Sequence, residues 1–137
     1  MTPESETERY RKGRELLEEM LGKKGAEATS ARFKELHPQF EKWVTEFVMA
    51  DIYARPGLDL KTRLLCTVAA LTVMGRQEQL KVHLERAVGA GATIAELDEV
   101  ILQMSAFGGF PATWDALATA RAVLGIGKND LPSDRTP

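Results

Sequence analysis

The sequence lacks several features that would assign the chain to a broad class of proteins at once. It has one cysteine among 137 residues, which excludes an internal disulfide and any Cys-x-x-Cys centre within one chain. A formal net charge of -2 and an isoelectric point near 5.7 give no electrostatic case for nucleic-acid binding. The N-terminus has no basic-then-apolar pattern typical of a signal peptide, so we expect a cytoplasmic protein.

The longest apolar run, Leu64 to Met74, is too short to cross a membrane. Its 11 residues fall well below the roughly 20 that a hydrocarbon core requires. Only Thr67 and Thr72 are polar, so no face of a helix built from this run suits water. We therefore expect other helices, including those of neighbouring subunits, to enclose it, with Cys66 behaving as a small buried hydrophobe.

Helical periodicity organises the remainder of the chain, and no strand alternation interrupts it. We expect a charged helix from Glu6 to Leu21 and a soft linker at 26–30. Apolar and aromatic residues then recur at helical spacing from Phe33 to Ile52, which predicts core positions. His37-Pro38 marks a turn or kink within that segment, because the residue before proline avoids the helical region.

Two further helices follow a glycine-rich connection after Ala87. Thr93 and Glu96 have the spacing of a capping box, which predicts a helix start there. Gly108-Gly109 should end that helix, and Pro111 suits the first turn of a last one reaching Leu124. The whole pattern predicts an all-α bundle of six or seven helices.

The expected organisation is one helical domain with extensions at both ends. Residues 1–30 form the charged helix and linker, 31–125 the helical domain, and 126–137 a flexible polar tail. A chain of this length supports a single hydrophobic core.

His83 is the residue of chemical interest in the helix that follows Gly75. It lies three residues after Leu80 and four before Ala87, at the border of an apolar stripe. Its imidazole titrates near neutrality, so it is a candidate acid or base. The other interpretation is a core histidine whose ring bonds a backbone carbonyl.

Several segments taken together resemble the carboxymuconolactone decarboxylase family, over a match from Phe33 to Leu124. Each segment alone would be weak, but the set is specific. The segments are Asp51-Ile52-Tyr53-Ala54-Arg55-Pro56-Gly57-Leu58, Thr62-Arg63, Gly75-Arg76, Glu78, His83, the Thr93 capping box and Gly108-Gly109-Phe110-Pro111-Ala112.

The resemblance extends to the wider AhpD-like superfamily, with one departure. AhpD-like alkylhydroperoxidases carry Cys-x-x-Cys-x-x-x-His, and alignment on His83 places their two thiols at Arg76 and Gln79 here. This removes the dithiol mechanism and favours the decarboxylase branch. The resemblance implies an AhpD-like helical subunit that assembles as a trimer or hexamer and needs no metal or organic cofactor.

The reaction that the resemblance implies is decarboxylation of 4-carboxymuconolactone to the β-ketoadipate enol-lactone, in the protocatechuate branch of aromatic catabolism. Such a site needs cations for the carboxylates and the developing oxyanion, and an acid to protonate carbon. Arg55, Arg63 and Arg76 lie in family-like segments and are the candidate substrate-binding residues, because guanidinium groups grip carboxylates in bidentate fashion. His83 is the candidate proton donor, and Glu78 is a second candidate catalytic residue.

Other interpretations of these residues stay open. Glu78 also fits a solvated glutamate in the first turn of a helix, where it favours the dipole, and Arg63 and Arg76 also fit ion pairs between helices. Two other functional classes remain: an AhpD-like redox protein in which Cys66 acts alone, and a non-catalytic helical oligomer that binds a small molecule.

Overall fold

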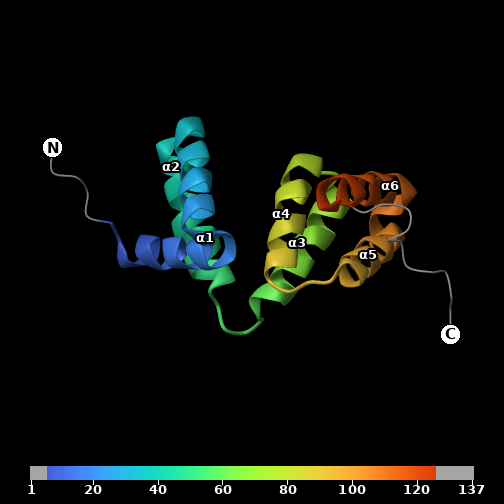
Figure 1. Ribbon diagram of the computed structural model, residues 1–137, viewed down its shortest axis with the longest axis horizontal. Coiled ribbons are helices and arrows are strands. Elements are labelled where there is room, and N and C mark those ends of the chain that lie inside the picture. The colour runs from blue at the N-terminus through green and yellow to red at the C-terminus, as the bar shows by residue number, and fades with distance from the viewer. Residues whose placement is uncertain (1–5, 126–137) are drawn as a thin grey trace. The chain divides into compact units, whose positions relative to one another are not determined.

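The computed structural model describes residues 6–125, and all regular structure in that range is helical. Six α-helices and one π-helix are present there, which confirms the predicted all-α class (Figure 1). None of these helices is long and apolar enough to span a bilayer. The chain divides into two compact units, residues 1–60 and 61–137, and the predicted tail at 126–137 lies outside the described residues.

The first unit begins with α1 (Glu8–Leu36), a helix with a sharp bend. The hydroxyl of Thr7 caps it by accepting a hydrogen bond from the Tyr10 amide at 3.0 Å. At Gly22 the backbone leaves the helical region, with φ 75° and ψ 168°, a conformation that favours glycine. Figure 1 shows the two parts of α1 running in different directions on either side of this bend.

The linker expected at 26–30 is wrong, because the helix resumes after the bend and continues to Leu36. Two small residues of this segment, Ala26 and Ser30, are buried. Ala26 belongs to a buried cluster with Leu17 and Met49, and the Ser30 hydroxyl donates to the Glu41 carboxylate at 2.9 Å. Small residues therefore mark a contact here, although their composition suggests a flexible connection.

The kink predicted at His37-Pro38 is confirmed. His37 is extended and separates α1 from α2 (Pro38–Trp43), and its ring Nδ1 accepts a hydrogen bond from the Gln39 amide at 3.0 Å. A π-helix, η1 (Val44–Tyr53), follows without a break. It ends where the Ala54 amide donates to the Met49 carbonyl five residues earlier, at 3.0 Å.

The aromatic residues expected in the core of this segment are largely exposed, so that prediction is wrong. Phe40, Trp43 and Phe47 have relative exposures of 40, 63 and 57%. The face turned toward α1 combines polar residues, which exchange hydrogen bonds with that helix, with two apolar residues. Its buried members are Glu41, Thr45, Glu46, Met49 and Ala50.

The core of the first unit is small. Leu17, Ala26 and Met49 form its buried cluster, with partly buried aliphatic residues around it. Gly13 permits the closest approach of α1 to η1, since a Cβ atom at this position would lie 1.9 Å from the Thr45 carbonyl oxygen. Any larger residue would force the two helices apart.

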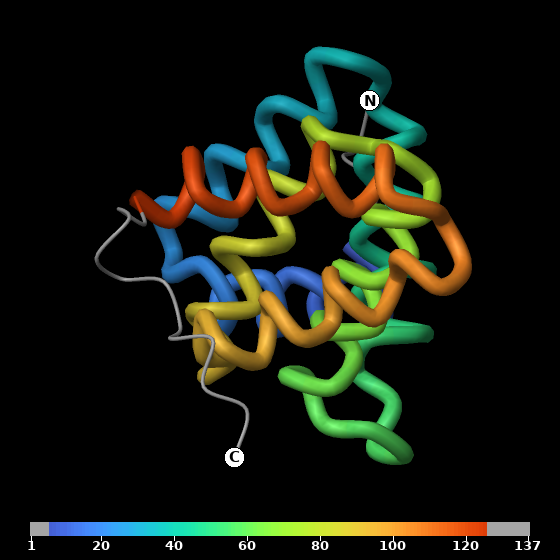
Figure 2. Tube along the Cα trace, turned by 90° about the vertical axis from the view of Figure 1, so that its right-hand side faces the viewer, coloured from blue at the N-terminus to red at the C-terminus, as the bar shows by residue number. Residues whose placement is uncertain are grey.

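The second unit contains α3 (Leu60–Met74), α4 (Gln77–Gly89), α5 (Ile94–Gln103) and α6 (Ser105–Leu124). Both α4 and α5 pack against α6, and Figure 2 shows α5 running in one direction and α6 returning. Leucine, isoleucine and valine make up its largest buried apolar side chains. These are Leu64, Val68, Leu80, Leu84, Leu97 and Ile101.

The capping box predicted before α5 is confirmed. The Thr93 hydroxyl accepts from the Glu96 amide, and the Glu96 carboxylate accepts from the Thr93 amide, both at 3.0 Å. The stop expected at Gly108-Gly109 is instead a bend inside α6, where Gly109 has φ 84°. Pro111 then lies in the first turn of the resumed helix, as its missing amide hydrogen requires.

The apolar run of α3 is less enclosed than its sequence predicts. Leu64, Val68 and Thr72 are its buried members, whereas Val73 and Met74 are 39 and 63% exposed. Cys66 is exposed as well, which corrects the expectation of a buried thiol. One chain therefore does not cover this helix on all sides.

Candidate functional site

The five site residues predicted from sequence lie in both units. Arg55 belongs to the first unit, where it follows η1, is exposed, and donates its amide to the Ile52 carbonyl at 3.1 Å. The other four are in the second unit: Arg63 is half-buried in the first turns of α3, and Arg76 is exposed immediately before α4. Glu78 and His83 are both on α4.

His83 lies in the middle of α4 and is half-buried. Its ring Nδ1 is 2.7 Å from the carbonyl oxygen of Gln79, one turn earlier. A carbonyl oxygen can only accept, so Nδ1 carries a hydrogen and the neutral ring is the Nδ1–H tautomer. The ring makes no second hydrogen bond within residues 6–125, and Nε2 is therefore the nitrogen that gains or loses a proton.

The surroundings of His83 favour its neutral form. Burial is the largest cause that lowers its pKa below the usual 6.5, and the positive charge of Arg86 acts in the same direction. The hydrogen bond to Gln79 opposes them without reversing the shift. At neutral pH the ring is therefore mainly uncharged, with Nε2 as an acceptor.

Arg86 is a residue that the sequence reasoning missed. It lies three residues after His83 on α4 and is only 9% exposed. Residues at this spacing are neighbours on a helix surface, which is why its charge acts on the imidazole. The sequence signal was the position of Arg86, three residues after His83 and directly before Ala87 of the apolar stripe. Arginine is rarely buried in proteins, so its burial here is unusual.

Glu78 does not contact His83 in this structure. Its side chain is 80% exposed and its carboxylate pairs with the Lys81 ammonium at 3.0 Å, three residues further along α4. Within residues 6–125, His83 likewise makes no hydrogen bond or ion pair with Arg63 or Arg76. The catalytic role of Glu78 stays a prediction, as do the substrate-binding roles of the three arginines.

Two polar contacts fix α4, α5 and α6 to one another. The Thr119 hydroxyl on α6 donates to the Gln77 side-chain oxygen on α4 at 2.6 Å. Arg121 on α6 grips the carboxylate of Asp98 on α5 with two bonds, at 2.8 and 3.1 Å. Asp98 is only 5% exposed, and such bidentate pairs fix orientation as well as distance.

The donor set around His83 suits acid–base chemistry on an anion. One imidazole nitrogen makes no hydrogen bond within residues 6–125, and the charge of Arg86 on the same helix acts on the ring. Within residues 6–125, no three or more His, Cys, Asp or Glu side chains come together to hold a metal ion. Whether the chain works without metal or organic cofactor stays a prediction.

The chain belongs to the carboxymuconolactone decarboxylase family, whose profile matches residues 38–122. This range includes α2, η1 and the four helices of the second unit up to Ala122. The resemblance found in the sequence is thereby confirmed.

Three relatives are similar to the chain. It is 32% identical over 133 residues to the 4-carboxymuconolactone decarboxylase of Acinetobacter baylyi, covering 95% of this chain and 99% of that protein. It is 42% identical over 92 residues to an uncharacterised 15.0 kDa protein of Paracoccus denitrificans, covering 66 and 69% of the two chains. A nitrosuccinic acid decarboxylase of Metarhizium robertsii is 26% identical over 84 residues, covering 61 and 59%.

The pKa of His83 should be directly measurable by NMR. In a His37→Asn variant, which keeps a good capping side chain and leaves one imidazole, the ring should titrate below 6.5 in the folded protein. Because the folded pKa is lowered, protonation favours the unfolded chain, so this group should reduce stability as pH falls from about 6.5 through the folded pKa. A midpoint above 6.5 would contradict the described environment.

Proposed function

We propose that the chain is a carboxy-lyase that converts 4-carboxymuconolactone to the β-ketoadipate enol-lactone without a cofactor. Two named relatives are decarboxylases, and one of them aligns over almost its whole length. The observation that carries the proposal is the His83 ring, bonded through Nδ1 to a backbone carbonyl with Nε2 left for the substrate.

The chemistry needs one proton for each carbon dioxide released. Loss of the carboxylate from the γ-carbon of the unsaturated lactone leaves an electron pair, which spreads through the double bond to the ring carbonyl oxygen. The resulting furanolate is then protonated at the α-carbon, which completes the exchange of carbon dioxide for hydrogen. The substrate's own conjugation holds the electrons, so the protein has to stabilise the oxyanion and supply the proton.

His83 supplies that proton from Nε2, because its Nδ1 hydrogen is held by Gln79. The free ring is mainly neutral, so it first has to be protonated. A bound dianion beside the ring favours the imidazolium and raises its pKa, which opposes the effects of burial and of Arg86. Substrate binding thereby charges the acid that the reaction needs.

Arginines hold the carboxylates and the developing oxyanion in this proposal. Arg55, Arg63 and Arg76 are the candidates within family-like segments, and Arg86 joins them because it is buried next to His83. A guanidinium in a mostly apolar site interacts more strongly with an oxyanion than it would in water. Glu78 remains a candidate for orienting His83 across a helix or subunit boundary.

Replacing His83 by alanine should reduce carbon dioxide release from 4-carboxymuconolactone by about 10²- to 10⁴-fold, the usual contribution of a positioned acid or base. The measurement is single-turnover loss of substrate absorbance with trapping of the gas. His37→Asn is the matched control, because it removes the other histidine and should keep full activity. Equal activity of both variants would remove His83 from the mechanism.

Replacing the arginine that binds substrate by methionine should lower kcat/KM by about 10- to 100-fold, as expected for loss of a charge-assisted hydrogen bond. We expect this from Arg86 and from at least one of Arg55, Arg63 and Arg76. Arg32→Met is the control, since Arg32 is exposed and lies outside the family match. Uniformly unchanged kinetics would exclude arginine from substrate binding.

A redox function of the AhpD-like type would have to depend on Cys66 alone. Positions 76 and 79, where the peroxidase thiols would lie, hold arginine and glutamine. Cys66 is exposed, so rapid labelling by a thiol reagent would report its accessibility and not a redox role. We retain the expectation of a cytoplasmic enzyme acting on a small acid.

We also infer that the chain forms a homo-oligomer, a trimer or hexamer. The support is the apolar surface of the second unit, where α6 bears an open groove of about 570 Å³ with an almost wholly apolar lining. Exposed apolar area of this kind marks contact surfaces. The most exposed apolar side chains of the second unit are Met74, Phe107, Phe110 and Trp114, of which the last two line the groove.

Light scattering should therefore give the mass of three or six chains for the native protein. Trp114→Glu should shift the distribution toward smaller species, because it places a charge in a surface that association would dry. Glu85→Gln, an exposed change on α4, should leave the mass unaltered. A native protein that remains monomeric at all concentrations tested would contradict the inference.

A further inference from the structure

The first unit contains a second cavity that the decarboxylase proposal does not use. It has a volume of about 330 Å³ and lies between the start of α1, the end of α1 and α2. This volume falls at the lower end of the range for small-molecule sites. Its lining combines two carboxylates, two ammonium groups, a phenol and an amide. The residues are Glu6, Thr7, Tyr10, Lys34, Pro38, Gln39, Glu41 and Lys42.

Glu41 is the unusual member of this lining, because its side chain is almost completely buried. The residue is 2% exposed, and its Oε1 accepts from three hydroxyl groups. Tyr10 donates at 2.6 Å, Ser30 at 2.9 Å and Thr45 at 3.2 Å. Burial and the bond to Glu41 raise the pKa of Tyr10, so the phenol remains a donor.

None of the ion pairs formed by residues 6–125 involves Glu41. Arg14 does not pair with Glu41 itself: it donates to the Ser30 hydroxyl at 3.0 Å, and its positive charge acts on the Tyr10 phenol. Buried carboxylates are normally paired with a cation, because hydroxyl donors alone do not replace the lost hydration of a full charge. Since all three hydroxyl bonds go to Oε1, Oε2 keeps its lone pairs for a further partner.

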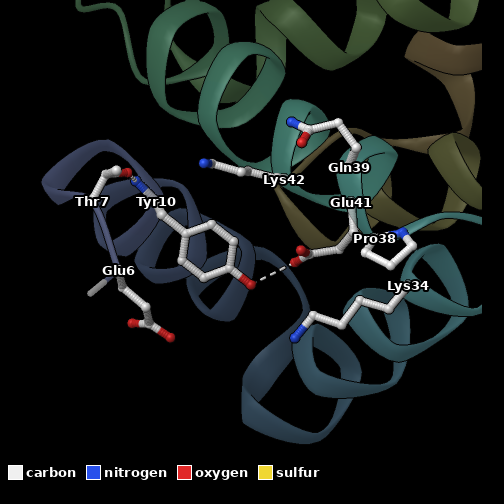
Figure 3. A pocket seen from close by; sticks show the side chains of 8 residues that line it. All are labelled: Glu6, Thr7, Tyr10, Lys34, Pro38, Gln39, Glu41 and Lys42. Carbon is white, nitrogen blue, oxygen red and sulfur yellow. Dashed lines mark hydrogen bonds between the residues drawn. The ribbon is translucent and has the colours of Figure 1, made fainter. Parts of the chain in front are cut away.

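The two lysines provide the opposite charge at the same cavity. Figure 3 shows the Tyr10 ring and the Glu41 carboxylate between the Lys34 and Lys42 side chains. Lys42 is within 3.9 Å of Glu46, whereas Lys34 takes part in none of the ion pairs of the described residues. The lining thus presents a fixed acceptor in its wall and ammonium groups nearby, with no net formal charge.

We propose that this cavity binds a small zwitterion, whose ammonium group pairs with Glu41 and whose carboxylate pairs with Lys34. A neutral lining with separated charges selects against a simple anion, which Glu41 and Glu6 would repel. It also selects against a simple cation, which the lysines would repel. The cavity shares no residue with the proposed decarboxylation site, so the two proposals are tested independently.

Isothermal titration of the full chain with ω-amino acids tests the proposal. Glycine, 4-aminobutanoate and 6-aminohexanoate carry the same two charges at increasing separation, so one length should bind best. Butanoate and butylammonium, which each carry half of the charges, should bind at least about tenfold more weakly than the best zwitterion. Absence of binding by all three amino acids would overturn the proposal, and so would equal binding by either half-ligand.

Variants locate the site. Glu41→Gln keeps an oxygen acceptor for the three hydroxyl groups but removes the charge, and should weaken binding at least about tenfold; Lys34→Met should act similarly. The controls Glu85→Gln and Lys12→Met change exposed residues outside the cavity and should bind normally. Lys34→Met remains informative if Glu41→Gln fails to fold, and unaltered binding in a folded variant of either residue would overturn the assignment.

Discussion

The hydrogen bond between His83 and the Gln79 carbonyl decides what the candidate site can do. It is an interaction within one helix, 2.7 Å long, and depends on no other element for its geometry. It assigns the hydrogen to Nδ1 and makes Nε2 the single point of proton exchange. The same bond is the one expected of a core histidine, so it fits both interpretations given for His83, and the catalytic role stays a prediction.

The burial of His83 and its charged neighbours depend on how the helices pack, and the spacing of residues in the sequence does not predict them. Arg86, which the sequence reasoning did not single out, is 9% exposed and lowers the pKa of His83. Glu78, which the family-like segment made a candidate, pairs with Lys81 in solvent. Sequence spacing places residues on a helix, but the neighbours of that helix determine which of them are buried.

Local sequence signals predicted helix boundaries correctly where the residues involved favour a single backbone arrangement. The Thr93 capping box and the His37-Pro38 break are both where the sequence puts them. The segment 26–30 was misjudged because small residues suit both flexible connections and tight helix contacts. Phe40, Trp43 and Phe47 are exposed because hydrogen bonds from α1 to Glu41 turn the opposite face of their segment inward.

The two units use polar groups in different ways. In the second unit, Asp98 and Arg121 neutralise each other across α5 and α6 with good geometry, so burial of the carboxylate is compensated locally. In the first unit, Glu41 is also buried, but its carboxylate accepts hydrogen bonds only from hydroxyl groups. The partner of Asp98 is thus a residue of the same chain, whereas Glu41 can take its cationic partner from a bound ligand.

The two tryptophans of the chain, Trp43 in the first unit and Trp114 in the second, are 63 and 76% exposed. An indole in water emits at longer wavelength than one in a dry contact. The molecule therefore carries an intrinsic optical probe on each unit, and a single-tryptophan variant would report separately whether either surface becomes covered when chains meet.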